Sequence, residues 1–428
     1  MTSVIGLGFS LALEALLPLA RLVILARLLP QDQFGIAVTI LVTLGIIEMC
    51  CEIALAQSAV RGSERIPIGR FIGTLHGLGV VRSFVMMLIA VLVLSVQRQA
   101  LDTTFGIDVI ILAAAILSLR AFENLSIKPL TRTYNFRREA VLTGGYQIIW
   151  TVTTAVSAYL SPSCASLFHG MLAGTAWMVL YSNLIAPDRW HARWERPAVA
   201  EALNFGAPLV PTGIASAIMT MDRLIVSVFL GTRAVAVYGV AIGLATLPRA
   251  ILYRFSVSVL VPHFANMASN PDKERRFYAL WLIIVSTLAG IYGLALILLG
   301  PIAIRFTFGP AYVPTELLMS LIATNAFIKF MMLVPVPAAF ARGHTSIVFH
   351  GSLVSALSSM PAALALLFGM KSLETFVLAL NVCEALGLIW FLLYATRRHG
   401  LRRAVALAAI AAPLIALGSM TARAWTGL

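Results

Sequence analysis

Apolar runs of about twenty residues recur along this chain, and each is long enough to cross the ~30 Å hydrocarbon core of a membrane as a helix. Hydrophobic residues make up 60% of the 428 residues and charged residues only 11%, well below the roughly 25% of a soluble domain. The alternating segments of about ten residues that mark a transmembrane barrel do not occur. The sequence therefore predicts an all-α, polytopic membrane protein.

Twelve core transmembrane helices are predicted, at 3–27, 34–57, 70–96, 107–127, 141–161, 163–186, 204–230, 234–262, 277–300, 313–341, 346–369 and 374–396. A candidate thirteenth helix covers 404–422, and it would make the C-terminus periplasmic if it spans the membrane. The connections between spans are too short for a soluble catalytic domain, so the chain is not expected to be an enzyme.

The basic residues of the loops gather on one side of the predicted membrane. That side holds Arg61, Arg65, Arg70, Lys128, Arg132, Arg137, Arg138, Arg189, Arg193, Arg196, Lys273, Arg275, Arg276, Arg342, Arg397, Arg398, Arg402 and Arg403, and the other holds Arg27, Arg98, Arg233, Arg305 and Lys371. By the positive-inside rule, the N-terminus and the even-numbered loops are cytoplasmic. The net charge of +13 then indicates loops facing anionic lipid rather than a nucleic acid partner.

The two halves of the chain resemble each other. "RLVILARLLPQDQFGIAVTIL" begins at Arg21 and "RLIVSVFLGTRAVAVYGVAIGL" at Arg223, and each has an Arg-Leu pair, an apolar half-helix, a short turn and an aromatic-Gly pair. A repeat of six helices predicts two parallel lobes around a central cavity, with chance similarity between apolar segments as the alternative. The predicted lobes are 1–186 and 204–396, joined by a cytoplasmic interfacial linker at 187–203 and followed by a basic segment with the extra helix at 397–428.

Ionisable residues inside the predicted spans are the candidate functional residues. An arginine near the bilayer centre costs about 2.5 to 17 kcal/mol, yet "LATLPRAILYRFSVSVLVP" carries both Arg249 and Arg254. Arg249 has no acid within a turn on its own helix, whereas Arg254 is close enough to the cytoplasmic end to snorkel. Lys329 lies near the middle of the tenth span and Arg21 in the first. These four side chains either face a hydrated cavity and bind substrate or form ion pairs between helices.

Acidic residues in the spans leave the same two interpretations open. Glu14 shares a helix face with Arg21, and Asp222 precedes Arg223 in the seventh span. Asp222 and Glu14 are the candidates for ion coupling, with ion pairing as the alternative. Glu384 in the twelfth span either faces the hydrated cavity or forms an ion pair between helices. A solvated rim is favoured for Glu48 and Glu52. No Walker A, HExxH, GxSxG or metal-spaced Cys/His pattern occurs, so no catalytic residue, metal site or cofactor is predicted.

Two stretches resemble a known family. "LARLLPQDQFGIAV", from Leu25 to Val38, resembles the turn between the first two helices of bacterial polysaccharide-repeat-unit (Wzx-type) flippases, which belong to the multidrug/oligosaccharidyl-lipid/polysaccharide exporter superfamily. "NFGAPLVPTGIASAIMTMDRLIVSVFLGTRAVAVYGVAIGLATLP", from Asn204 to Pro248, is similar to the seventh and eighth helices of that family. The motifs mark this branch of the superfamily and do not specify the sugar, the pathway or the coupling ion.

The resemblance implies alternating access between two six-helix bundles. It also implies transport of an undecaprenyl-diphosphate-linked oligosaccharide to the periplasmic leaflet of the bacterial inner membrane, with membrane lipids and polysaccharide polymerase or export proteins as partners. Arg21, Arg249 and Arg254 occupy places comparable to the cavity arginines of related flippases. A multidrug or small-metabolite exporter of the same superfamily is the alternative. A membrane-embedded polymerase or glycosyltransferase is disfavoured because no large outer loop is present.

Overall fold

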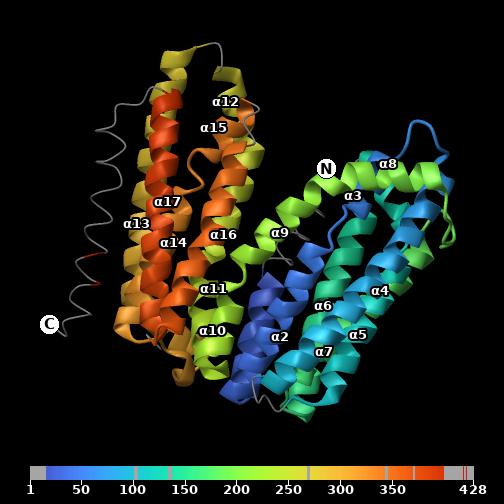
Figure 1. Ribbon diagram of the computed structural model, residues 1–428, viewed down its shortest axis with the longest axis horizontal. Coiled ribbons are helices and arrows are strands. Elements are labelled where there is room, and N and C mark those ends of the chain that lie inside the picture. Colours follow the sequence, from blue (N-terminus) through green and yellow to red (C-terminus); the bar gives the residue numbers. More distant parts are fainter. Residues whose placement is uncertain are drawn as a thin grey trace. The chain divides into compact units, whose positions relative to one another are not determined.

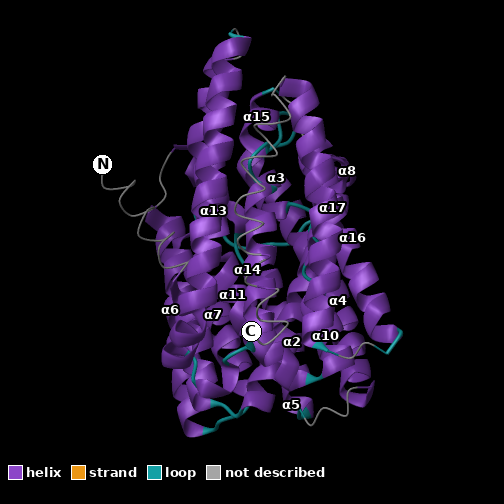
Figure 2. Cartoon of the chain, turned by 90° about the vertical axis from the view of Figure 1, so that its left-hand side faces the viewer, coloured by secondary structure: helices purple, strands orange, loops and turns teal. Residues whose placement is uncertain are grey.

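A computed structural model describes residues 16–100, 105–133, 137–267, 270–342, 346–369 and 372–399, together with 418 and 421. All the secondary structure in these ranges is helical, as Figures 1 and 2 show. By its internal contacts the chain divides into two compact units, Met1–Ala217 and Ile218–Leu428. The predicted helix at 404–422 and the predicted site residue Glu14 lie outside the described residues.

Unit 1 contains the first six predicted spans and the segment that follows them. After a helix at 16–28 come α2 (Gln31–Cys50), α3 (Leu55–Arg61), α4 (Ile68–Ala100), α5 (Ile107–Leu119), the 3-10 turns η1 (Arg120–Phe122) and η2 (Leu125–Thr133), α6 (Arg137–Leu160), α7 (Ala165–Ile185), α8 (Arg196–Gly206), η3 (Ala207–Leu209) and α9 (Val210–Met219). The second predicted span is thus divided. Between α2 and α3 the backbone of Ala54 is left-handed, with φ of 54°, and its N–H donates to Glu52 Oε1 at 2.8 Å.

The seventh predicted span is also broken, because Pro208 and Pro211 cannot donate helical hydrogen bonds. Helices α8 and α9 meet at a bend of 44°. Both pack closely on the end of α2: a Cβ added to Gly206 would lie 2.2 Å from the carbonyl oxygen of Ile53, and one added to Gly213 would lie 2.2 Å from that of Met49. These close approaches tie α8 and the start of α9 to unit 1, and α8 lies across the end of α4 (Figure 1).

Unit 2 contains α10 (Asp222–Leu230), α11 (Thr232–Phe255), a π-helical turn η4 (Ser256–Leu260), α12 (Val261–Met267), α13 (Pro271–Thr307), η5 (Pro310–Tyr312), α14 (Glu316–Met331), α15 (Val336–Ala341), α16 (Ser346–Leu367) and α17 (Leu373–His399). Two predicted spans break toward their C-terminal ends. The eighth passes through the π turn, and the tenth unwinds at 332–335, where Trp281 Nε1 donates to the freed carbonyl of Val334 at 3.2 Å. The break in the tenth span therefore comes with a side chain that satisfies an exposed backbone group.

Within the described residues, six helices are long and apolar enough to cross a membrane by themselves: Gln31–Cys50, Ile68–Gln99, Thr232–Tyr253, Pro271–Thr307, Glu316–Ala341 and Leu373–Trp390. The bent pair formed by α8 and α9 adds a seventh if it counts as one span. The chain is a multi-pass membrane protein. The division into lobes at 187–203 stays a prediction, since the two compact units part further along, within the broken seventh span.

Candidate functional site

Seven polar side chains from four helices meet inside unit 2. This unit 2 polar cluster consists of Asp222 from α10, Tyr238 and Arg249 from α11, Asn325 and Lys329 from α14, and Asn381 and Glu384 from α17. The sequence singled out Asp222, Arg249, Lys329 and Glu384 separately, and the fold brings them together. The three neutral members were missed, because an amide or phenol in an apolar span is too common a signal by itself.

Glu384 is the centre of this cluster. Its carboxylate lies 3.5 Å from the ammonium of Lys329, and its Oε2 accepts a hydrogen bond from Asn325 Nδ2 at 2.9 Å. The same amide lies 2.9 Å from Oδ1 of Asn381. Because the carboxylate side chain is only 2% exposed, this is a buried ion pair completed by an amide. Of the two readings left open for Lys329 and Glu384, ion pairing is therefore present.

Asp222 is held by neutral donors. Tyr238 donates its hydroxyl to Oδ2 at 2.7 Å, and the backbone N–H of Arg223 donates to Oδ1 at 2.8 Å. The carboxylate is the first residue of α10, where the N-terminal dipole also favours a negative charge. The pairing expected with Arg223 is therefore a backbone contact.

Arg249 differs from the other cations of the cluster. It follows Pro248 in α11, its Nε is buried, and no hydrogen bond to that atom occurs within the described part of the chain. The charge that acts on it most strongly is that of Glu384, which Lys329 and Asn325 already hold. This guanidinium thus retains unused donors in an apolar helix. The side chain of Arg254 lies outside what the structure describes, so its predicted role stays a prediction.

Arg21 lies in unit 1 and is 5% exposed. Its guanidinium donates to Gln147 Oε1 at 3.1 Å and Thr151 Oγ1 at 3.5 Å, and it stacks 3.5 Å above the ring of Trp150. All three partners come from α6 and all are neutral. These contacts hold the guanidinium by two hydrogen bonds and a cation–π interaction, and none of them neutralises its positive charge.

A cavity of about 450 Å³, lined by both polar and apolar side chains, lies inside unit 1, and the sequence analysis overlooked it. Arg82 and Arg120 line it, and they pair with Glu52 (2.9 Å) and Glu48 respectively. Both arginines lie in predicted spans, the same signal that marked Arg249. Glu48 and Glu52, expected at a solvated rim, each form an ion pair, because α4 and η1 place an arginine beside each carboxylate, and both side chains stay partly exposed.

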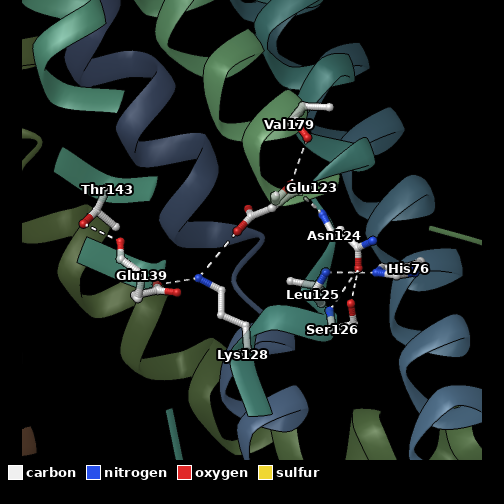
Figure 3. A network of polar contacts seen from close by, with 10 residues as sticks. His76, Glu123, Asn124, Leu125, Ser126, Lys128, Glu139, Thr143 and Val179 are labelled. Atoms are coloured by element: carbon white, nitrogen blue, oxygen red, sulfur yellow. Dashed lines mark hydrogen bonds and ion pairs between the residues drawn. The ribbon is translucent and has the colours of Figure 1, made fainter. Parts of the chain in front are cut away.

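Figure 3 shows the polar contacts at one side of this cavity. Lys128 bridges Glu139 at 2.7 Å and Glu123 at 3.5 Å. Burial by itself would lower the pKa of Lys128, but the two carboxylates outweigh it and raise that pKa. The loop after α5 is therefore held to α6 by a charged bridge.

His76 ties two loops to α4 in the same region. Its Nε2 accepts the N–H of Leu125 at 3.0 Å, as Figure 3 shows, so the neutral ring carries its proton on Nδ1 and donates to the carbonyl of His191 at 3.0 Å. Trp190 stacks on the same imidazole with 5.5 Å between centroids. The predicted linker is thus anchored to unit 1 at this point. No group of three or more metal-ligating side chains suited to an ion occurs among the described residues.

The fold is similar to that of solved membrane transporters. The inward-facing conformation of a multidrug resistance MATE family transporter matches with a TM-score of 0.66 and 12% identity, covering 93% of this chain and 98% of that one. The inward closed conformation of the lipid II flippase MurJ matches with a TM-score of 0.68 and 15% identity, covering 98% and 92%. At these identities the likeness concerns the fold, and it confirms the predicted class of all-helical, twelve-helix membrane protein.

The chain belongs to the polysaccharide biosynthesis protein family, which it matches over residues 24–317. It is 24% identical to the lipopolysaccharide biosynthesis protein WzxC of Escherichia coli K12, over 66% of this chain and 56% of that protein. It is 21% identical to the amylovoran biosynthesis protein AmsL of Erwinia amylovora, over 54% and 61%. The match therefore spans less than two-thirds of either relative. The family resemblance inferred from the two sequence motifs is confirmed.

Proposed function

We propose that the protein is a flippase that carries an undecaprenyl-diphosphate-linked oligosaccharide repeat unit from the cytoplasmic to the periplasmic leaflet of the bacterial inner membrane. It would work by alternating access in surface polysaccharide biosynthesis, with its N-terminus in the cytoplasm and with polymerase and export proteins as partners. Family membership and the names of the two relatives support this proposal, as does the likeness to a lipid flippase fold.

The observation that carries the proposal is the guanidinium of Arg249, whose Nε is buried without a hydrogen-bond partner among the described residues. A diphosphate cannot cross the hydrocarbon core without fixed positive charge, and guanidinium presents parallel N–H donors that match two phosphate oxygens. Arg249 has donors that no described residue uses, in a helix where an unused charge is costly. We assign it the first contact with the diphosphate.

Lys329 and Arg254 complete the proposed diphosphate site in unit 2. Lys329 is held in place by Glu384, and the diphosphate would share that ammonium with the carboxylate. Arg254 lies on the same helix as Arg249. Arg21, in unit 1, is proposed as a further substrate-binding cation. Asp222, with Glu14 as a second candidate, is the proposed coupling residue for a proton or sodium gradient, because a buried carboxylate held by neutral donors can exchange a cation.

A multidrug exporter is the competing function, favoured by the likeness to the MATE transporter and by the buried carboxylates of Asp222 and Glu384. Cationic drugs would then be bound by these acids, and Arg249 would hinder transport. The two functions make opposite predictions for removal of Arg249.

The test is a leaflet-resolved measurement of lipid-linked oligosaccharide in cells with the intact gene, a deletion, Arg249→Ala or Arg249→Lys. We expect the deletion and Arg249→Ala to trap the intermediate on the cytoplasmic side, and Arg249→Lys to slow transfer by about tenfold because it loses the bidentate contact. Arg305→Ala, an exposed arginine on α13, is the matched control and should transfer normally. Normal transfer in the deletion strain would refute the flippase. Faster efflux of a cationic dye in Arg249→Ala would support the exporter.

A further inference from the structure

We propose that the cavity inside unit 1 is a binding site for a neutral sugar ring of the lipid-linked oligosaccharide. It lies beside Arg21, whose guanidinium donates to the cavity-lining Gln147, and is distinct from Arg249, Arg254 and Lys329 of unit 2. This inference rests on the proposed function and names a second part of the same substrate. Every residue that lines the cavity belongs to unit 1. Its volume of about 450 Å³ lies in the range of ligand-binding pockets.

The charges around the cavity favour a neutral ligand. Two guanidinium groups, Arg82 and Arg120, and two carboxylates, Glu52 and Glu123, line it. Each of these groups already has a partner of opposite charge, since Arg120 pairs with Glu48 and Glu123 with Lys128. A phosphate would meet two carboxylates and a cation two arginines, whereas an uncharged polyol can donate to the acids and accept from the arginines.

Hydrogen-bonding groups on the cavity wall remain available to such a ligand. Gln57 and Ser83 line the cavity, and no described residue forms a hydrogen bond with their side chains. Gln57 offers two N–H donors and a carbonyl acceptor, and Ser83 offers one hydroxyl. Gln57 lies in α3 and Ser83 in α4, so the two side chains line the cavity from different helices. A ring with hydroxyls along its edge can use both.

The remaining lining provides apolar surface for the faces of a sugar ring. Leu75, Met86 and Met178 line the cavity together with Tyr146, whose hydroxyl accepts from Arg120 at 3.4 Å. This contact fixes the orientation of the phenol. Aliphatic and aromatic surface beside convergent polar groups is what a pyranose requires, since its hydroxyls lie at the rim and its C–H bonds on the faces. A fully charged or fully apolar ligand would leave half of this lining unmatched.

Substitutions on the wall can close the cavity without touching its ion pairs. Gly79 lines it, and a Cβ at that position would meet only Leu55 Cδ1, at 3.7 Å, which is ordinary contact. Gly79→Ala should therefore fold normally, and Gly79→Leu should occupy part of the space. Gln57→Leu removes hydrogen-bonding groups at nearly constant volume. Gln99, an exposed glutamine near the other end of α4, gives the matched control Gln99→Leu.

The experiment is saturation-transfer NMR on the full chain in lipid nanodiscs, with glucose, galactose, mannose and N-acetylglucosamine as probes at millimolar concentration. We expect transfer to at least one sugar in the intact protein and in Gln99→Leu. It should be lost in Gly79→Leu and weakened by about fivefold in Gln57→Leu, the value of one hydrogen bond. Thermal unfolding of each variant checks that it is folded, and Gln57→Leu decides the outcome if Gly79→Leu does not fold.

Three results would overturn the inference. They are no transfer to any of the four sugars, transfer in Gly79→Leu and Gln57→Leu equal to that in the intact protein, or displacement of the sugar by inorganic phosphate. The leaflet-resolved measurement distinguishes an error in the cavity assignment from an error in the proposed flippase function. If the deletion traps the intermediate and sugars do not bind, only the cavity assignment is lost. If the deletion strain transfers the intermediate normally, the proposed function itself is lost.

Discussion

Tyr292 donates a hydrogen bond of 2.7 Å from α13 to the carbonyl oxygen of Leu244 in α11. That carbonyl would normally accept the N–H of residue 248, but residue 248 is a proline and has no N–H. An unpaired carbonyl in a membrane-embedded helix costs several kcal/mol, so the phenol of Tyr292 stabilises the proline-containing helix that carries Arg249.

Removal of this hydroxyl should therefore destabilise unit 2. We expect Tyr292→Phe to lower the free energy of unfolding by about 1–3 kcal/mol, the cost of leaving a buried acceptor unpaired. A thermal unfolding series in detergent measures this, with Tyr159→Phe, at an exposed tyrosine, as the control. In a Pro248→Ala background the helix regains its own donor, so Tyr292→Phe should then have little effect. Equal losses in both backgrounds would mean that the hydroxyl does not serve the proline.

The buried pair of Lys329 and Glu384 predicts an asymmetry between single and double substitutions. Glu384→Gln leaves a buried ammonium without its counter-ion and should cost about 3–5 kcal/mol. Lys329→Met combined with Glu384→Gln removes both charges and should recover a large part of that loss. Unfolding temperatures of the two single variants and the double variant measure the coupling. Additive losses would show that the two charges do not stabilise each other.

The close approach of α9 to α2 predicts that the two glycines 213 and 243 respond differently to the same change. A methyl group at Gly213 would lie 2.2 Å from the carbonyl oxygen of Met49, whereas nothing lies within 4 Å of one at Gly243. Gly213→Ala should therefore lower the unfolding temperature and the yield of folded protein. Gly243→Ala should be neutral or stabilise α11 by up to about 1 kcal/mol, because alanine favours a helix. The prediction fails if both variants unfold at the same temperature.

The ion pairs of Lys128 with Glu123 and Glu139 should stabilise the fold by an amount that does not change between pH 6 and pH 9. Its two carboxylate partners raise its pKa in the folded state, although burial opposes them. A raised lysine pKa gives stabilisation that is complete below the unfolded pKa of about 10.4 and is lost only as the pH rises through the folded value. Lys128→Met should thus lower the unfolding temperature by the same amount at pH 6, 7, 8 and 9. A difference that shrinks toward pH 9 would contradict the bridge to Glu123 and Glu139.

Much of the fold could be predicted from the sequence because hydropathy and the positive-inside rule act along the chain. The runs that predict α4, α13 and α17 need no knowledge of their neighbours, since twenty apolar residues cross a membrane wherever they pack. Intramembrane charge likewise marked Arg249 and Glu384 without any structure. The same signal was present at Arg82 and Arg120 and was overlooked.

The helix breaks could not be predicted in this way. Left-handed Ala54 depends on a hydrogen bond from its own N–H to the carboxylate of Glu52, and the unwound turn at 332–335 depends on Trp281 from another helix. Each break requires a partner that satisfies the freed backbone group. The partner of Val334 comes from tertiary packing and leaves no local pattern, whereas the partner of Ala54 lies two residues away in the same loop.

The sequence by itself determined that this protein is helical, lies in a membrane, and places charge within its spans. Tertiary structure alone decided how these charges are compensated: Lys329 pairs with Glu384 and Arg120 with Glu48, whereas the Nε of Arg249 has no hydrogen-bond partner among the described residues. The physical reason is that transfer of a residue into lipid depends on that residue and its neighbours along the chain. Pairing a buried charge depends instead on the distance between two side chains, which only the packing of separate helices sets.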